Sequence, residues 1–339
     1  MSENRIDIQP FFTYLESRID HTLAEEVMWL NIYGYKVKLI FAGLKPDPVM
    51  IHNLGLFTVD ECDHCDERVY LWEDDLDTVM QESVREEYHW KWGYQMNEDY
   101  HVRKPGITRR LAARDNHAHI TYLCFDHGSI WPIVYLNKPF VNEMQWWLWD
   151  RFFLLHGAAV GMNGKGALIT SPSGKGKSTL ALACLLEGTE YAAEDYVLIA
   201  REGSPRAYPI FRTGYLVPKS LDMLAELKAH VLLYAESKNK YLIDLSPYQD
   251  QFREGLELKM IIYPHICDIE EPEIVPARDA RPFVSSLTST VRQIKSQQKF
   301  APAFFALFAR LNSLAGYEMR LCHEPRKNAE YLKHFLEQK

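Results

Sequence analysis

The chain has 339 residues and a net charge of −8, and 25% of its residues are charged and 47% hydrophobic. This composition is typical of a soluble globular protein, and the length suggests two domains. The negative charge provides no general attraction to nucleic acid or to an anionic membrane, so neither is expected as a partner.

The start of the chain is polar, so no signal peptide is expected. The most hydrophobic segment, residues 146–155, is interrupted by Asp150 and Arg151 and is too short to span a bilayer. Six cysteines without an export signal favour free thiols and a cytoplasmic location. Cys62 and Cys65 have a metal-ligand spacing, but no second cysteine pair follows, so an ordinary loop and a zinc site both stay open.

Apolar periodicity predicts a mixed helix and strand content for the first half of the chain. In chain order the expected elements are a helix at 10–24, strands at 35–41, 54–59 and 68–72, a charged surface helix at 75–90, and strands at 117–124 and 130–136. Residues 93–116 show no clear pattern and are locally basic, which fits either a solvated loop or ribbon or an anion-binding segment.

Residues 137–139 end in a proline and mark the expected domain boundary. We predict an N-terminal mixed α+β domain at 1–137, a candidate for acceptor or partner recognition, and a catalytic domain at 138–339. The elements expected in the second half are a helix at 140–149, strands at 167–170, 191–199, 207–210 and 260–263, and helices at 179–186, 220–230, 283–297, 303–314 and 327–337.

Residues 167–179 combine an apolar strand, a glycine loop and a helix start, which is the layout of a phosphate-binding P-loop. The pattern G-x-x-x-x-G-K-[ST] is met with Ser171 in the first position and Gly176, Lys177 and Ser178 in the last three. The glycines let backbone N–H groups point at phosphate oxygens, and the helix N-terminus favours the same anion. Lys177 would reach the terminal phosphates, and Ser178 would bind Mg²⁺. The predicted nucleotide-binding residues are Ser173, Gly174, Lys175, Gly176, Lys177, Ser178 and Thr179.

Two further features accompany this loop. His156 precedes Gly157 on the preceding strand, and its imidazole could donate to a phosphate oxygen or steer a proton. Glu194 and Asp195 are adjacent carboxylates within the apolar stretch 191–199. One of them would reach the metal and the other would accept a hydroxyl proton.

Three scattered cations, Arg212, Lys219 and Arg281, follow the acidic pair. One or two of them could balance phosphate charge in a transition state, although any single one is also a plausible surface residue.

This order of motifs, with His156 and Gly157, then the loop, then Glu194 and Asp195, resembles the catalytic domain of HPr kinase/phosphorylase. It is also similar to the wider set of HPr-kinase-like P-loop serine kinases, some of which phosphorylate a serine in ribosomally made precursor peptides such as lasso peptides. The resemblance implies an α/β (α+β) chain whose catalytic domain has the HPr kinase and phosphoenolpyruvate carboxykinase-like fold.

By this resemblance Lys177 and the loop amides hold the phosphates of ATP, and Ser178 and Asp195 bind Mg²⁺. Glu194 is given the role of catalytic base, and His156 lies beside the transferred phosphate. The family usually has two aspartates at the acidic pair. It also has a glycine- and isoleucine-rich segment where this chain reads residues 211–218, so HPr is not favoured as the substrate.

The leading hypothesis is an ATP- and Mg²⁺-dependent kinase that phosphorylates a hydroxyl, either a serine of a peptide or protein or a small molecule. The alternative is a nucleotide-gated peptide- or protein-binding module without phosphotransfer. A carboxykinase is weaker, because the sequence offers no clear set of additional metal-binding His and Lys positions. A homo-oligomer is compatible with each of these hypotheses.

Overall fold

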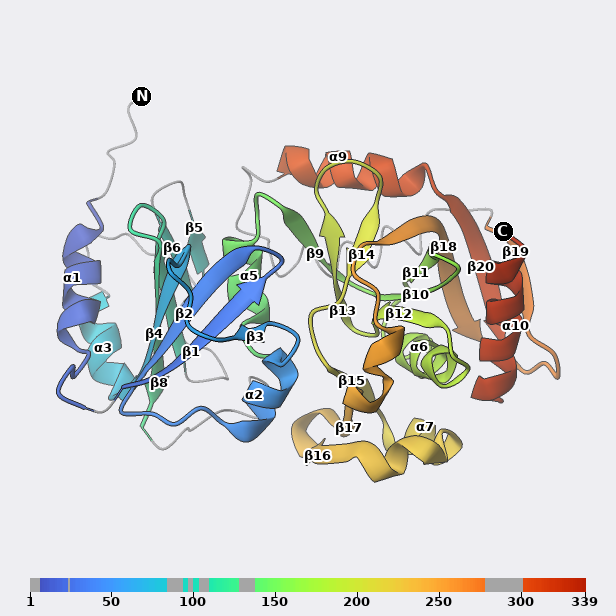
Figure 1. Ribbon diagram of the computed structural model, residues 1–339, viewed down its shortest axis with the longest axis horizontal. Coiled ribbons are helices and arrows are strands. Elements are labelled where there is room, and N and C mark those ends of the chain that lie inside the picture. Colours follow the sequence, from blue (N-terminus) through green and yellow to red (C-terminus); the bar gives the residue numbers. More distant parts are fainter. Residues whose placement is uncertain are drawn as a thin grey trace. The chain divides into compact units, whose positions relative to one another are not determined.

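The computed structural model describes residues 7–23, 25–83, 94–96, 100–103, 110–127, 138–277 and 301–339. The chain divides into two compact units, Met1–Pro139 and Phe140–Lys339 (Figure 1). Each unit combines helices with mixed sheets, which fits the α+β class expected from the sequence. Among the described residues, no helix has the length and apolar character needed to cross a bilayer.

The first unit is built on an eight-stranded sheet with the order β3-β1-β2-β4-β8-β7-β6-β5. The sheet is mixed, because β2, β4 and β8 run parallel whereas the β1–β2 and β7–β8 pairs are antiparallel. The strands are β1 (Glu25–Ile32), β2 (Tyr35–Ala42), β3 (Thr58–Val59), β4 (Glu67–Asp74), β5 (Tyr94–Met96), β6 (Tyr100–Arg103), β7 (Arg110–Asp115) and β8 (Ile120–Asp126).

The described helices of this unit are α1 (Gln9–Ser17), α2 (Pro48–Leu54) and α3 (Leu76–Ser83). The side chain of Asp47 starts α2 by accepting hydrogen bonds from the N–H groups of Val49 and Met50. Helices α1 and α3 bury apolar residues such as Leu15 and Val79 against one face of the sheet. Each such large apolar side chain contributes about 1.5–3 kcal/mol of stability.

Several sequence predictions for this half need correction. The first helix ends at Ser17 rather than at residue 24, and β1 was not predicted. Residues 54–59, expected to form a strand, instead contain the end of α2, a turn and the short β3. The described part of residues 93–116 forms the antiparallel strands β5, β6 and β7. The strand expected at 130–136 lies outside the described residues.

The second unit contains a nine-stranded sheet, ordered β12-β10-β11-β18-β14-β13-β9 with β20 on β18 and β19 on β20, and a separate three-stranded sheet, β15-β17-β16. The strands of the larger sheet are β9 (Phe152–His156), β10 (Ala158–Met162), β11 (Lys165–Ile169), β12 (Glu190–Ala193), β13 (Tyr196–Ala200), β14 (Arg206–Tyr208), β18 (Leu256–Ile266), β19 (Glu273–Pro276) and β20 (Ala315–Leu321). The small sheet consists of β15 (Thr213–Leu216), β16 (Val231–Ala235) and β17 (Lys240–Asp244). The described helices are α5 (Val141–Trp147), α6 (Lys177–Leu186), α7 (Pro218–Met223), α9 (Ala301–Asn312) and α10 (Pro325–Glu337), with short 3-10 turns at Ala225–His230, Glu236–Lys238 and Ser246–Gln251.

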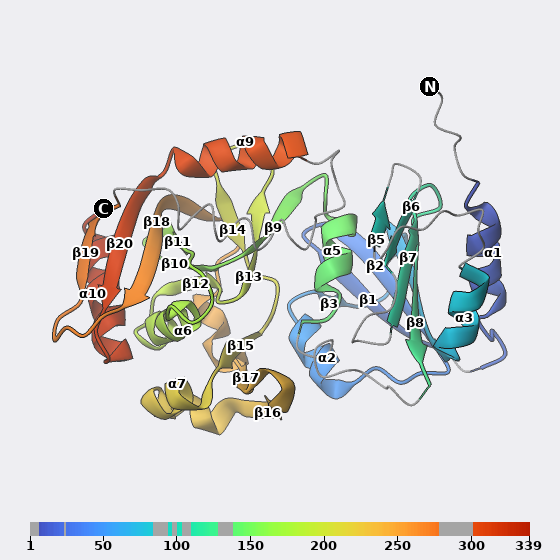
Figure 2. The ribbon, with the colours of Figure 1, turned by 180° about the vertical axis from the view of Figure 1, so that it is seen from behind.

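Alternating side chains give the large sheet two apolar cores, one on each face. On β11, Ala167 and Ile169 belong to one core and Leu168 to the other, as the two-residue period of a strand requires. Helices α6 and α10 cover the first face, and α9 covers the second (Figures 1 and 2). This packing fixes the start of α6 at the end of β11.

Residues 191–199 were predicted to form one strand, and this is wrong. The stretch forms β12, which is the first strand in this order, and β13, which is the last but one, and a bend at Glu194 and Asp195 joins them. Strand β12 pairs with β10, and β13 pairs with β9. The helix expected at 220–230 is likewise divided into α7 and a 3-10 turn, and the helix expected at 283–297 lies outside the described residues.

Candidate functional site

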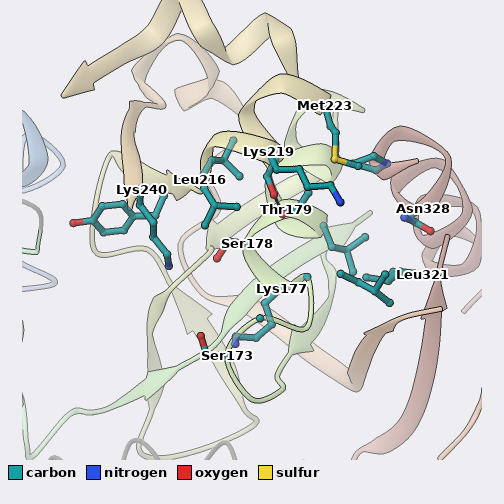
Figure 3. A pocket seen from close by; sticks show the side chains of 18 of the residues that line it. Ser173, Lys177, Ser178, Thr179, Leu216, Lys219, Met223, Lys240, Leu321 and Asn328 are labelled. Carbon is teal, nitrogen blue, oxygen red and sulfur yellow. Dashed lines mark hydrogen bonds between the residues drawn. The ribbon is translucent and has the colours of Figure 1, made fainter. Parts of the chain in front are cut away.

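A cavity of about 370 Å³ lies at the start of α6 in the second unit. The glycine loop forms one wall, and residues from the small sheet, α7 and the connection from β20 to α10 form the others (Figure 3). Of the predicted site residues, those that line it are His156, Ser173, Gly174, Gly176, Lys177, Ser178, Thr179 and Asp195. Lys175 and Glu194 do not.

The loop between β11 and α6 turns at two glycines with positive φ, Gly174 at +80° and Gly176 at +94°. A Cβ atom on Gly176 would also lie 2.8 Å from Cδ1 of Leu321, so backbone conformation and space both favour glycine there. Gly176 is the N-cap of α6 and offers no side chain to the N–H groups of the first helical turn. These donors are therefore available to an anion in the cavity.

Lys177, the first residue of α6, is buried, and its Nζ donates a 2.7 Å hydrogen bond to the carbonyl oxygen of Ser171. Burial lowers the pKa of the Lys177 ammonium, and the negative charges of Asp195 and Glu194 oppose this shift. A phosphate group in the cavity would favour the charged form of this lysine and offset part of the cost of its burial.

The two hydroxyl residues that follow Lys177 have different surroundings. Oγ1 of Thr179 lies 2.8 Å from Oγ of Ser220 on α7, so the threonine hydroxyl has a protein partner. Ser178 lines the cavity and is drawn between Lys240 and Lys177 in Figure 3. Ser178 is thus the better placed of the two to supply an oxygen ligand.

His156 and Asp195 form a pair in which Nε2 of the histidine lies 3.1 Å from Oδ1 of the aspartate. The strand register explains this contact, because His156 is opposite Tyr196 in the β9–β13 pair and Gly157 N donates to the backbone oxygen of Asp195 at 2.9 Å. Both side chains keep partial access to solvent, with 25% of His156 and 19% of Asp195 exposed. The pair can therefore exchange a proton with a molecule in the cavity.

Glu194 points to a different partner from its neighbour. Its side chain is buried, and its Oε1 accepts a 2.7 Å hydrogen bond from the backbone N–H of Tyr215 on β15. This contact ties the bend between β12 and β13 to the small sheet. The structure thus brings His156, Lys177 and Asp195 to one cavity but places the carboxylate of Glu194 outside its lining.

The three candidate cations differ in their position relative to the cavity. Lys219, on α7, lines the cavity. Arg212 does not line it, and its Nη2 donates to Oε1 of Gln249 at 3.0 Å. Arg281 lies outside the described residues. Sequence reasoning missed Lys240, which reaches the cavity from β17. No local motif marks this lysine, because its position depends on the pairing of β15 with β17.

The part of the cavity away from Lys240 is apolar. Figure 3 shows Met223 and Leu321 around this part, together with Asn328 and the ammonium of Lys219, whereas Leu216 is drawn beside Lys240. Asn328 holds Cys322 in the wall of this part. The Oδ1 atom of Asn328 accepts a hydrogen bond from Cys322 N, and its Nδ2 donates one to Cys322 O, both at 2.9 Å. The cavity therefore combines a cationic, hydroxyl-rich part with a more apolar part that Lys219 also reaches.

Cys62 and Cys65, the candidate zinc ligands, lie in the first unit. Both are free thiols that are partly exposed. Within the described ranges, no group of three or more His, Cys, Asp or Glu side chains is arranged to hold a metal ion. The zinc interpretation of this pair therefore gains no support.

No family model matches the chain, and no curated protein matches it either. Among solved structures, the HPr(Ser) kinase/phosphatase from Coxiella burnetii is similar at 13% sequence identity and a TM-score of 0.28. This match covers 55% of the present chain and 98% of the other.

Proposed function

We propose that this protein is an ATP- and Mg²⁺-dependent kinase that transfers the terminal phosphoryl group to a hydroxyl. One observation supports this function above all others. A glycine loop, the buried cation Lys177 and the His156–Asp195 pair face a single cavity. Phosphoryl transfer requires mainly a phosphate cradle, compensating charge and a group that takes the acceptor proton, and this cavity offers each of them.

The two parts of the cavity suggest how the nucleotide lies. Its phosphates fit the loop, where the N–H groups of the first α6 turn and the ammonium of Lys177 are concentrated. Its base fits between Met223 and Leu321, in the apolar part. In this orientation the terminal phosphate lies toward Ser178 and Asp195.

Mg²⁺ would be held by the hydroxyl of Ser178 and the carboxylate of Asp195, which are oxygen ligands of the kind this ion prefers. When bound, the ion would neutralise charge on the phosphate oxygens. The chain's own contribution is to hold these two ligands at the same cavity and to supply the positive charge of Lys177.

We infer that the Asp195–His156 pair accepts the proton of the acceptor hydroxyl. As the acceptor oxygen forms its bond to the terminal phosphorus, the bond from that phosphorus to the bridging oxygen breaks and ADP leaves. The acceptor proton passes to the pair, where the 3.1 Å contact lets the aspartate stabilise a protonated imidazole. Glu194 was the expected base, but its contact with Tyr215 N favours an anchoring role.

The function is tested by incubating the purified protein with Mg²⁺ and γ-labelled ATP. We expect slow transfer of the label to water without an acceptor, and loss of both nucleotide binding and turnover in Lys177→Ala. Unchanged nucleotide binding in this variant would reject the site. Binding without any release of the label would favour the nucleotide-gated binding module instead. Acceptor recognition by the first unit, a homo-oligomer and a cytoplasmic location stay predictions.

A further inference from the structure

Lys240 is one of the cavity residues to which the proposed loop chemistry assigns no function. It begins β17, the central strand of the small sheet, and reaches the cavity from a different sheet than the loop does. Asn239 before it adopts a left-handed conformation with φ of +49°, which turns the chain from the 3-10 segment into β17. The side chain of Lys240 is thus positioned by a defined turn at the start of β17.

The aromatic ring of Tyr215 supports this lysine. Nζ of Lys240 lies 5.6 Å from the ring centroid, and Nζ of Lys238 lies 5.2 Å from it. Tyr215 is buried, and its backbone N–H is held by Glu194. Of the two lysines at this ring, only Lys240 lines the cavity. The ammonium of Lys240 therefore lies within cation–π range of a buried ring whose backbone N–H is held by Glu194.

The position of Lys240 along the cavity identifies what it would meet. In Figure 3 its ammonium lies on the Ser178 side, whereas Met223 and Leu321 surround the opposite part. A nucleotide with its base in the apolar part and its inner phosphates on the loop places its last phosphate toward Lys240. Lys177 and Lys240 both line this cavity, so a polyanion bound between them would meet both positive charges.

We propose that Lys240 binds the terminal phosphate of a nucleoside triphosphate and makes the site prefer a triphosphate over a diphosphate. This inference rests on the proposed function, since it takes the phosphates to lie on the loop. Lys177, on α6, would bind the phosphate chain from one side, and Lys240, on the small sheet, would bind its terminal phosphate from the other. Release of the diphosphate after transfer would then be favoured, because the diphosphate no longer carries the phosphate group that contacts Lys240.

The test compares Mg-ATP and Mg-ADP binding by calorimetry in the wild type, Lys240→Met, Lys240→Arg and the matched control Lys238→Met. We expect Lys240→Met to bind ATP at least roughly tenfold more weakly, the effect of one charge-assisted hydrogen bond, and to bind ADP within about twofold of the wild type. Lys240→Arg should restore most of the ATP preference, because it keeps the charge. Lys238→Met should bind both nucleotides as the wild type does.

Equal weakening of ATP and ADP in Lys240→Met would overturn the inference, and so would unchanged binding of both. A similar loss of ATP affinity in Lys238→Met would overturn it too. The loss would then come from removing a lysine at the Tyr215 ring rather than from a contact between Lys240 and the phosphate. Circular-dichroism melting of each variant separates a folding defect from a binding defect. Failure of the proposed function is a different outcome, in which the wild type binds neither nucleotide or Lys177→Ala binds both normally.

Discussion

Oε1 of Glu194 accepts a hydrogen bond from the backbone N–H of Tyr215 at 2.7 Å, and the adjacent Asp195 instead contacts Nε2 of His156 at 3.1 Å. Two carboxylates that are neighbours in sequence thus have separate functions. One joins two sheets, and the other faces the cavity. Their substitution should therefore have different consequences.

The first prediction distinguishes these functions by a pair of amide variants. Glu194→Gln keeps an oxygen acceptor for Tyr215 N, so it should retain most of its turnover and its nucleotide affinity. Asp195→Asn removes the carboxylate of the His156–Asp195 pair and should lower turnover by about 10²–10⁴, the usual contribution of a positioned base. Steady-state kinetics at saturating Mg-ATP measures both. Loss of turnover in Glu194→Gln as large as that in Asp195→Asn would instead make Glu194 the base.

A second prediction follows from the lowered pKa of Lys177. Because burial disfavours its charged form, the folded protein without nucleotide is destabilised by this ammonium at neutral pH. Lys177→Met should therefore melt at or above the wild-type temperature, although it no longer binds nucleotide. Consider the pH range between the lowered pKa of Lys177 in the folded protein and its ordinary value of 10.5 in the unfolded chain. In this range the unfolded state binds more protons than the folded state, so the wild type gains stability as the pH rises.

The advantage of Lys177→Met should accordingly be greatest near pH 7 and shrink as the pH approaches 10.5. Melting curves of both proteins across this range provide the measurement. A variant that melts well below the wild type at pH 7, with a difference that does not change with pH, would contradict the prediction.

The third prediction concerns the loop glycine that begins α6. In Gly176→Ala the new Cβ would combine a positive φ with a 2.8 Å approach to Leu321, so the loop must shift and nucleotide affinity should fall at least tenfold. Gly164→Ala is the matched control, because Gly164 has a φ of +75° and no atom within 4 Å of the place its new methyl group would occupy. Each alanine must adopt a left-handed backbone conformation, which should lower the free energy of unfolding by about 1–2 kcal/mol. Only Gly176→Ala should also weaken nucleotide binding. Equal nucleotide affinities would show that the loop tolerates the shift.

The fourth prediction concerns the clamp that Asn328 forms on Cys322. Asn328→Ala leaves the N–H and C=O groups of a buried residue without their side-chain partner, which should lower the free energy of unfolding by about 2 kcal/mol. Lys327→Ala, which removes solvent-screened contacts to Glu271, Glu324 and the Glu270 carbonyl, should change the free energy of unfolding much less. Urea denaturation measures both, and equal losses would mean that the clamp adds nothing.

The sequence indicates the glycine loop and its neighbours because their geometry is local. A strand, a loop with glycines and a helix start are consecutive, so Gly174, Gly176 and Lys177 could be placed from their order alone. The acidic pair is found for the same reason, but its geometry is not, because residues 191–199 look like one strand. A bend between two strands cannot be recognised in an apolar stretch whose two halves are both buried.

Lys240 and the Asn328 clamp were beyond prediction for a different reason. Each acts through contacts between distant segments, namely the β15–β17 register and the packing of α10 beside α6. Neither residue belongs to a motif, and a single lysine in a polar turn looks like any surface lysine. Only the three-dimensional pairing of the strands reveals it.

The parallel pairing of β11 with β18 has a consequence for the order in which the protein can fold. The strand that leads into the loop is complete at Ile169, but its neighbour β18 spans Leu256–Ile266, and Leu321, which contacts the Gly176 position, comes later still. Such non-local contacts form only after long loops have closed. A ribosome-bound chain that has just made α6 therefore carries every residue of the loop motif without being able to hold it in shape. Nucleotide binding should thus arise late in synthesis, once β18 and β20 have emerged.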